Sequence, residues 1–255
     1  MGRLLIGRRV VFAFPKKRFG AWAEEAVTVP SLCAPVPDAL TDAAAVNLLT
    51  NGATAVGVCE TLRKGGHRGA VITAAAGDLG RLLRHHLRTV GMHVVCIVRS
   101  TAQVELLLQD DESHVLDITD PNFDQLLAEM CARLSITAAI DSISGSMPEH
   151  LVSAMPANST IWMLGQLSGR SLSIDAMDRI IGRDTTITGF NVEHWFAKKS
   201  ILTAFFALRK ATKLLIANPP PPPRFEVGLE ELIHIFPDAI TNTTTGKTLI
   251  RPFKK

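Results

Sequence analysis

The sequence contains no tyrosine, and aromatic residues make up only 5% of its 255 residues. Few aromatic side chains leave few surfaces on which unpaired bases could stack, so we expect no nucleic-acid partner. Every long apolar run is interrupted by a charge or an amide before it reaches the roughly 18 residues that a membrane-spanning helix needs. We therefore expect no membrane span.

Cysteine is also scarce. The four cysteines lie far apart and form no C-x-x-C pair. This spacing predicts reduced thiols in a reducing compartment and no metal site, because disulfide frameworks and zinc sites need closely grouped ligands. We expect an intracellular protein, and the sequence does not distinguish cytoplasm from mitochondrion. The cysteines are Cys33, Cys59, Cys96 and Cys131.

From residue 69 onward, short apolar runs alternate with helical patterns. The runs cover 69–75, 93–98, 114–118, 137–143, 159–165 and 185–192, and the helical patterns cover 79–90, 101–108, 122–134, 148–154 and 199–217. Strands that are apolar on both faces and alternate with helices predict a parallel sheet covered on both sides. The expected fold class is α/β, a Rossmann doubly wound parallel sheet. After the prolines at 219–223, we expect a short helix over 225–236 and a strand over 248–250.

The helical pattern at 79–90 has one apolar side. Its arginines and histidines are expected to point mostly away from that side and into solvent. The apolar stripe consists of Leu79, Leu82, Leu83, Leu87 and Val90, and the polar residues are Arg81, Arg84, His85, His86 and Arg88.

The strongest chemical signal lies between the first strand and this helix, where Thr73–Gly80 reads TAAAGDLG. This is a relaxed form of the dinucleotide fingerprint, A-x-x-G-x-x-G. A pyrophosphate needs close approach of the backbone and free amide groups at a helix start, and Gly77 and Gly80 suit both needs. We expect Ala76, Gly77, Asp78 and Leu79 to contact the pyrophosphate.

Asp78 leaves two interpretations open. It can be an ordinary acidic residue in the first turn of a helix, where a negative charge is favourable. It can also imitate the missing phosphate and so weaken cofactor binding.

The second strand ends in Arg99 and Ser100. An enzyme that prefers NAD would offer an acidic residue to the ribose hydroxyls near this point. A guanidinium and a hydroxyl instead suit a 2′-phosphate, so the expected cofactor is NADP, bound as NADPH. An exposed arginine without a ligand is the alternative.

Several motifs in order resemble the medium-chain dehydrogenase/reductase superfamily, and most of all its zinc-free quinone reductase and enoyl-thioester reductase branch. They are GAWAE at 20–24, VTVP at 27–30, AAAVNLLT at 43–50, the glycine turn, DSISG at 141–145, GQLSG at 165–169 and GKTLI at 246–250. The resemblance covers nearly the whole chain. It also explains the basic, acid-free first twenty residues better than a mitochondrial transit peptide does, because Ile6–Phe12 resembles a strand of the family's GroES-like β-barrel.

The resemblance implies three parts: a remnant of the GroES-like catalytic domain at 1–45, the cofactor domain at 46–218, and a proline linker with a returning C-terminal segment at 219–255. About a hundred residues that family members carry before this point are expected to be missing. It also implies that further residues lie near the nicotinamide. These are Asn47, Thr50, Ser144, Gly145, Gly165, Gln166 and Leu167. For Asn47 and Thr50, the alternative is a helix-capping asparagine and an ordinary turn threonine.

Two functions follow. One is an NADPH-dependent oxidoreductase that transfers hydride to a quinone, an enone or an enoyl thioester. The other is a catalytically impaired pseudoenzyme that uses its Rossmann domain for cofactor binding or assembly. The absence of tyrosine removes the catalytic tyrosine of the related enoyl reductases, so no catalytic residue is assigned. The resemblance and the uncharged strand at 185–192 together predict a homodimer, because open sheet edges recruit partners.

Overall fold

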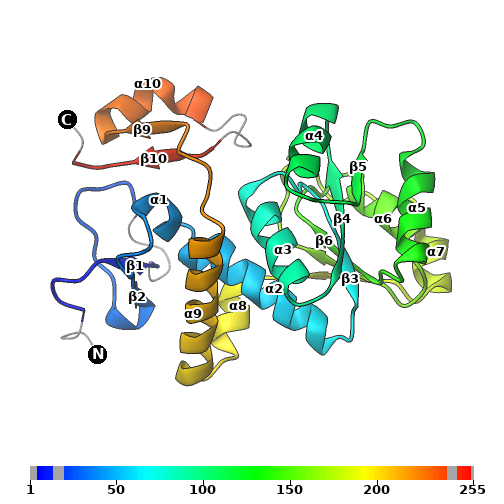
Figure 1. The fold of residues 1–255 in the computed structure, drawn as a ribbon, viewed down its shortest axis with the longest axis horizontal. Coiled ribbons are helices and arrows are strands. Elements are labelled where there is room, and N and C mark those ends of the chain that lie inside the picture. Colours follow the sequence, from blue (N-terminus) through cyan, green and yellow to red (C-terminus); the bar gives the residue numbers. More distant parts are fainter. Residues whose placement is uncertain (1–4, 14–19, 240–245, 254–255) are drawn as a thin grey trace. The chain divides into compact units, whose positions relative to one another are not determined.

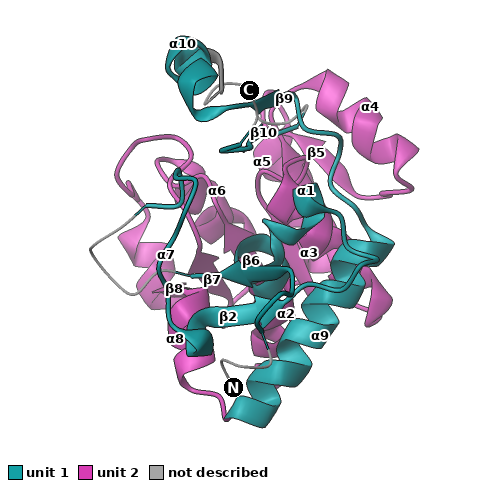
Figure 2. Cartoon of the chain, turned by 90° about the vertical axis from the view of Figure 1, so that its left-hand side faces the viewer, with its two compact units in different colours: residues 1–53, 201–255 teal, residues 54–200 magenta. Residues whose placement is uncertain are grey.

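The computed structural model describes residues 5–13, 20–239 and 246–253, so the basic N-terminal segment is described only in part. The chain divides into two compact units (Figure 2). The first unit comprises residues 1–53 and 201–255, and the second comprises residues 54–200. The domain borders expected from the sequence, after residues 45 and 218, differ from these limits and stay a proposal. Each unit is described by itself.

The second unit is built on a six-stranded sheet. Its strands are β3 (Gly69–Ile72), β4 (His93–Val98), β5 (Val115–Asp117), β6 (Ala138–Asp141), β7 (Thr160–Met163) and β8 (Thr186–Gly189). They lie in the order β5-β4-β3-β6-β7-β8, and every neighbouring pair is parallel. This is the strand order of the doubly wound dinucleotide-binding fold, so the predicted fold class is confirmed.

Helices cover both faces of this sheet, with α3 on the side opposite α5 and α6 (Figure 1). The helices of the unit are α2 (Ala53–Lys64, whose first residue belongs to the other unit), α3 (Asp78–Thr89), α4 (Thr101–Gln109), α5 (Phe123–Arg133), α6 (Met147–Ala154), α7 (Met177–Gly182) and α8 (Val192–Ala197). On the α5 and α6 side, the core packs Leu127 and Leu151 against the β-branched strand residues Val71, Val95 and Ile161. These aliphatic side chains are fully buried, which explains why the strands read as continuous apolar runs.

Two short helices were not expected. α7 lies between β7 and β8, and α8 begins where the sequence predicted the end of a strand. The strand stops at Gly189 because Asn191 starts a helix: its Oδ1 accepts hydrogen bonds from the amides of Glu193 and His194, at 2.8 and 3.1 Å. This side-chain cap ended the strand earlier than the β-prone composition suggested.

The prediction for the two sides of α3 is wrong in part. Arg84 is buried, with 1% of its surface exposed, whereas Val90 at the end of the apolar stripe is 36% exposed. His85 and His86 are half-buried rather than fully solvated. Burial lowers the pKa of His85, and the positive charges of Arg84 and Arg81 lower it further.

The first unit contains two small sheets. β1 (Val10–Phe12) pairs antiparallel with β2 (Cys33–Pro35), and β9 (Phe225–Val227) pairs parallel with β10 (Thr248–Ile250). Its helices are α1 (Asp42–Ala45), α9 (Ile201–Ala217) and α10 (Leu229–Ala239), with a 3₁₀ turn η2 (Pro30–Leu32) and a π turn η3 (Leu48–Gly52). The helix predicted over 225–236 is wrong at its start, because pairing with β10 holds residues 225–227 extended. Within the described residues, no helix has the length and apolar character to cross a bilayer.

Candidate functional site

The candidate site lies at the carboxyl ends of β3 and β6, where the strand order reverses, the usual ligand-binding position of a doubly wound sheet. Two buried side chains join these strand ends. The Thr73 hydroxyl donates to Asp141 Oδ1 at 2.7 Å and accepts from the Ser142 amide at 2.9 Å. Both Thr73 and Asp141 are almost completely buried. The pair therefore fixes the glycine turn after β3 relative to the loop after β6.

Asp141 also shapes the loop that follows it. Its carboxylate accepts hydrogen bonds from the amides of Ile143 and Ser144, at 3.1 and 2.8 Å. Ser144 and Gly145 then adopt positive φ angles of 63° and 66°. A side chain at Gly145 would be strained in this conformation, and its Cβ would lie 3.1 Å from Ser168 Oγ. This tight turn sets Ser144 and Gly145 at the strand end.

The loop after β7 runs beside the loop after β6. The Leu164 amide donates to the Asp141 carbonyl at 2.7 Å, and the Leu167 amide donates to the Ser142 carbonyl at 3.0 Å. Gly165, Gln166 and Leu167 are exposed, and Gln166 Nε2 donates to the Arg170 carbonyl at 2.7 Å. The structure thus brings two predicted segments together, 144–145 and 165–167.

The glycine turn begins with Ala74, which has a φ of 49°, and ends at Gly77, the residue that precedes the first turn of α3. A Cβ on Gly80 would lie 2.6 Å from the carbonyl oxygens of both Ala74 and Ala75. Only glycine permits this approach. The first amides of a helix have no acceptor within the helix, and Gly77 has no side chain to cap them. The turn therefore has the two properties that a bound pyrophosphate requires.

Asp78 is the first residue of α3, and Arg81 follows within the same turn. Arg81 is half-buried. Desolvation lowers its pKa, while the negative charge of Asp78 opposes that shift. The carboxylate at the helix start is therefore accompanied by a cation. In either interpretation of Asp78, Arg81 would offset part of the repulsion between its carboxylate and a phosphate.

Arg99 and Ser100 follow β4 directly. Arg99 is exposed, and its amide donates to Gln103 Oε1 at 3.2 Å. Ser100 precedes the first turn of α4 with extended backbone angles, yet its hydroxyl makes no capping bond to the helix. An arginine and a serine thus occupy consecutive positions at the end of β4, the second strand of the Rossmann sheet in chain order.

Asn47 and Thr50 belong to the first unit. Thr50 is exposed in η3, whereas Asn47 is buried just before it. The Asn47 side chain makes no capping hydrogen bond to η3, so it is not the helix-capping asparagine of the alternative interpretation. Its Oδ1 accepts from Asn51 Nδ2 and Lys247 Nζ, both at 3.1 Å, and its Nδ2 donates to the Ala43 carbonyl at 3.2 Å. Lys247, within the GKTLI motif, is a neighbour of Asn47 that the sequence did not indicate.

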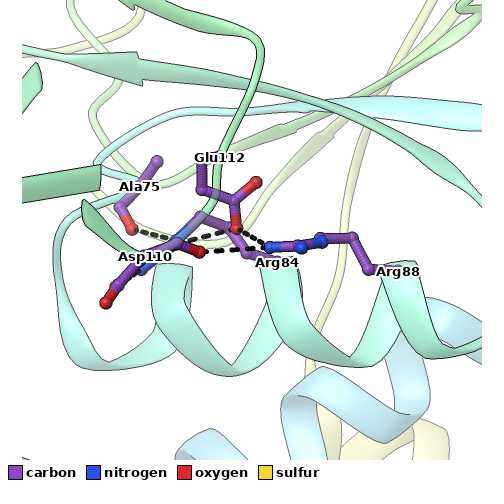
Figure 3. A network of polar contacts seen from close by, with 5 residues as sticks. All are labelled: Ala75, Arg84, Arg88, Asp110 and Glu112. Carbon is purple, nitrogen blue, oxygen red and sulfur yellow. Dashed lines mark hydrogen bonds and ion pairs between the residues drawn. The ribbon is translucent and has the colours of Figure 1, made fainter. Parts of the chain in front are cut away.

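A charge network built on the buried Arg84–Glu112 pair contacts the glycine turn through the Ala75 carbonyl (Figure 3). Arg84 donates to the Ala75 carbonyl, to Glu112 and to Asp110, and Glu112 also pairs with Arg88. Sequence reasoning missed it because Arg84 was assigned to the solvent side of α3. The available signal was the acidic segment at 110–112 immediately before the third strand, which could have suggested a cationic partner.

Among the residues that the structure describes, no group of three or more histidine, cysteine, aspartate or glutamate side chains is arranged to hold a metal ion. Cys59, Cys96 and Cys131 are buried and Cys33 is half-buried, all as free thiols. Burial raises the pKa of the Cys96 and Cys131 thiols to about 12, so neither is a reactive thiolate near neutral pH.

No model of a known protein family matches the chain, and no curated protein matches it. Solved structures do. A Mesorhizobium loti protein assigned as an NADPH:quinone reductase superimposes with a TM-score of 0.87 at 26% identity, covering 98% of this chain and 72% of that one. A 2-haloacrylate reductase has a TM-score of 0.81 at 20% identity, covering 97% and 77%.

The E. coli K-12 protein YhdH, solved with bound NADPH, has a TM-score of 0.64 at 21% identity and covers 96% of this chain and 75% of its own. At these identities, the haloacrylate reductase and YhdH support the fold alone, and the Mesorhizobium protein matches the fold over nearly the whole chain at a somewhat higher identity. The parallel strand order agrees with the resemblance of the sequence motifs to those of quinone reductases. In its fold and over nearly its whole length, the chain is similar to quinone-reductase-like members of the medium-chain dehydrogenase/reductase superfamily.

Proposed function

We propose that this chain is an NADPH-dependent oxidoreductase that reduces a quinone, an enone or an enoyl thioester. The observation that carries the proposal is the glycine turn at the point where the strand order reverses, with Gly80 packed against the carbonyls of Ala74 and Ala75. Backbone packed this closely at a helix start is what a dinucleotide pyrophosphate requires. The NADPH named for the YhdH structure agrees with this cofactor.

The residues present fit such a cofactor. The amides at Ala76–Leu79 would hold the pyrophosphate, and Arg99 and Ser100 would hold the 2′-phosphate of the adenosine ribose. Ser144–Gly145 and Gly165–Leu167 would border the nicotinamide and exclude water from it. The resemblance adds Asn47 and Thr50 near the nicotinamide ribose.

When bound, the reduced nicotinamide supplies the hydride, and the protein supplies binding and orientation. The Thr73–Asp141 pair contributes by fixing two of the loops that would meet the cofactor. With no tyrosine in the chain, the group that protonates the product is unassigned.

The pseudoenzyme alternative is favoured by one observation, the carboxylate of Asp78 at the start of α3. It predicts either no nucleotide binding or binding without turnover. Steady-state oxidation of NADPH with a quinone, an enone and an enoyl thioester as acceptors separates the two functions. Loss of NADPH absorbance that depends on the acceptor supports the enzyme, and binding without such loss supports the alternative.

The first prediction concerns cofactor choice. The chain should bind NADPH about tenfold or more tightly than NADH, because a charged hydrogen bond from Arg99 to the 2′-phosphate contributes about 1.5–3 kcal/mol. Arg99→Ala should remove this preference and leave the Kd for NADH unchanged. Nicotinamide fluorescence titrations measure both constants. Arg133→Ala, which removes an equally exposed arginine at the end of α5, is the control. Equal affinities for the two cofactors in the unsubstituted chain would contradict the prediction.

We also propose that the chain forms a homodimer through β8, the edge strand of the sheet. Thr186–Gly189 carries no charge, and three of its four residues are exposed. A two-fold pairing of such an edge satisfies its open hydrogen-bonding groups. Ile187 packs on the core, so Thr188 is the position to test.

The second prediction is that the chain sediments as a dimer at micromolar concentration and that Thr188→Lys yields the 27.6 kDa monomer. Pairing around a two-fold axis would bring two added lysines close together, and like charges across strands repel. Gln109→Lys, an exposed position at the end of α4, should leave the dimer intact. A monomeric unsubstituted chain would refute the dimer. A dimeric Thr188→Lys variant would show that the dimer interface does not lie at β8.

A further inference from the structure

Arg84 is a buried cation in the middle of α3, and its guanidinium has three acceptors (Figure 3). Nε donates to the Ala75 carbonyl at 3.1 Å, Nη1 to Glu112 Oε1 at 2.8 Å, and Nη2 to Asp110 Oδ2 at 3.1 Å. Arg88 adds a second cation at 3.0 Å from the same Glu112 oxygen. Two arginines thus face two carboxylates, and the charges balance.

Ala75 belongs to the glycine turn. Three contacts hold it in place, one at its amide and two at its carbonyl. The Ala75 amide donates to the Ile97 carbonyl of β4 at 3.2 Å, Gly80 packs beside the Ala75 carbonyl, and Arg84 donates to it. A peptide group is planar and trans, so fixing the carbonyl of Ala75 also fixes the direction of the Ala76 N–H. Ala76 is the first residue of the segment expected to hold the pyrophosphate.

Stability alone does not explain this arrangement. Moving charges out of water is costly, and a well-packed apolar pair of similar volume is often as stable as a buried ion pair. Glu112 has only 3% of its side chain exposed, as buried as Arg84 at 2%. What an apolar pair cannot do is donate a hydrogen bond to Ala75.

The acceptors come from the segment that ends α4. Asp110 follows α4 directly, and Asp111 turns the chain with a φ of 58° before Glu112. The helix begins just after Arg99 and Ser100, the residues placed for the 2′-phosphate. Arg84 therefore joins the pyrophosphate turn to the far end of the helix that follows the 2′-phosphate site.

We propose that Arg84 is a positioning residue for the pyrophosphate of the dinucleotide: its guanidinium, held by Glu112 and Asp110, sets the Ala75 carbonyl and thereby the Ala76 amide. This inference rests on the proposed nucleotide binding. It assigns to a buried ion pair a role in ligand affinity that is separate from its role in folding.

The test compares NADPH with 2′-AMP, which has the adenine and the 2′-phosphate but no pyrophosphate. In the double variant Arg84→Met with Glu112→Met, both buried charges go together, so the melting temperature should stay close to that of the parent. NADPH should nevertheless bind about tenfold more weakly, while 2′-AMP, measured by NMR titration, should bind as before. The affinity ratio is a readout that a purely structural role would not move.

Glu112→Gln is the matched control, because it removes the charge of Glu112 but leaves Arg84 beside the Ala75 carbonyl. It should lower the melting temperature without weakening NADPH binding. If the double variant is unfolded, Arg84→Lys takes its place, since a compact ammonium group lacks the planar guanidinium fork that reaches Ala75, Glu112 and Asp110 from three separate nitrogens, and the same loss for NADPH alone is expected. Unchanged NADPH affinity in a folded Arg84 variant would overturn the inference. Failure of the unsubstituted chain to bind NADPH would instead refute the proposed function, and the inference with it.

Discussion

Gly80→Ala should abolish detectable NADPH binding and lower the free energy of unfolding by about 1–3 kcal/mol, the usual cost of forcing an extra group into packed structure. The added Cβ would lie 2.6 Å from two backbone oxygens, those of Ala74 and Ala75. Backbone cannot rotate aside as a flexible side chain can, so the turn itself must move. Movement of the turn would displace the amides that we propose hold the pyrophosphate.

Urea unfolding and nicotinamide fluorescence test this expectation together. Gly182→Ala is the matched control, because a Cβ at that position meets no atom within 4 Å and it lies in the same unit. It should change stability by less than about 1 kcal/mol and leave binding unchanged. If Gly80→Ala binds NADPH normally, the close packing of the turn is not required for cofactor binding. The packing of Gly80 would then no longer support the proposed function.

Arg84→Met alone should destabilise the protein by about 3–5 kcal/mol, the range observed when one partner of a buried ion pair is removed. The loss would leave Glu112 buried with Arg88 as its remaining cation, and Arg88 is 40% exposed. It would also leave the Ala75 carbonyl without the bond from Arg84. Because total stabilities of domains are commonly about 5–15 kcal/mol, a change of this size should be plain in a urea titration.

Arg88→Met provides the comparison one turn further along the same helix. It makes the same chemical change to an arginine that binds the same carboxylate, but at an exposed position, so its cost should stay near about 0–1 kcal/mol. Equal costs for the two variants would mean that burial of the Arg84 pair is not what matters. A small cost for Arg84→Met would indicate that water enters and hydrates Glu112.

The sequence alone predicted the doubly wound sheet, because strands buried on both faces must be apolar throughout and helices must alternate with them. The glycine turn could also be predicted from the sequence. Where two backbone segments pack closely, a residue with a Cβ does not fit, so glycines recur at a set spacing. The residues after the β4 strand, Arg99 and Ser100, could be found by counting from that turn. These features depend on local geometry, which neighbouring residues determine.

Only the tertiary structure decided the rest. Arg84 was assigned to solvent because helical periodicity describes one helix at a time. The pattern contains no information on Asp110 and Glu112, more than twenty residues away, whose negative charges offset the cost of burying the guanidinium. The same holds for Thr73 and Asp141, 68 residues apart, whose bond forms only because β3 and β6 are neighbours in the sheet. Polar groups are buried where distant partners satisfy them, and a linear pattern does not contain those partners.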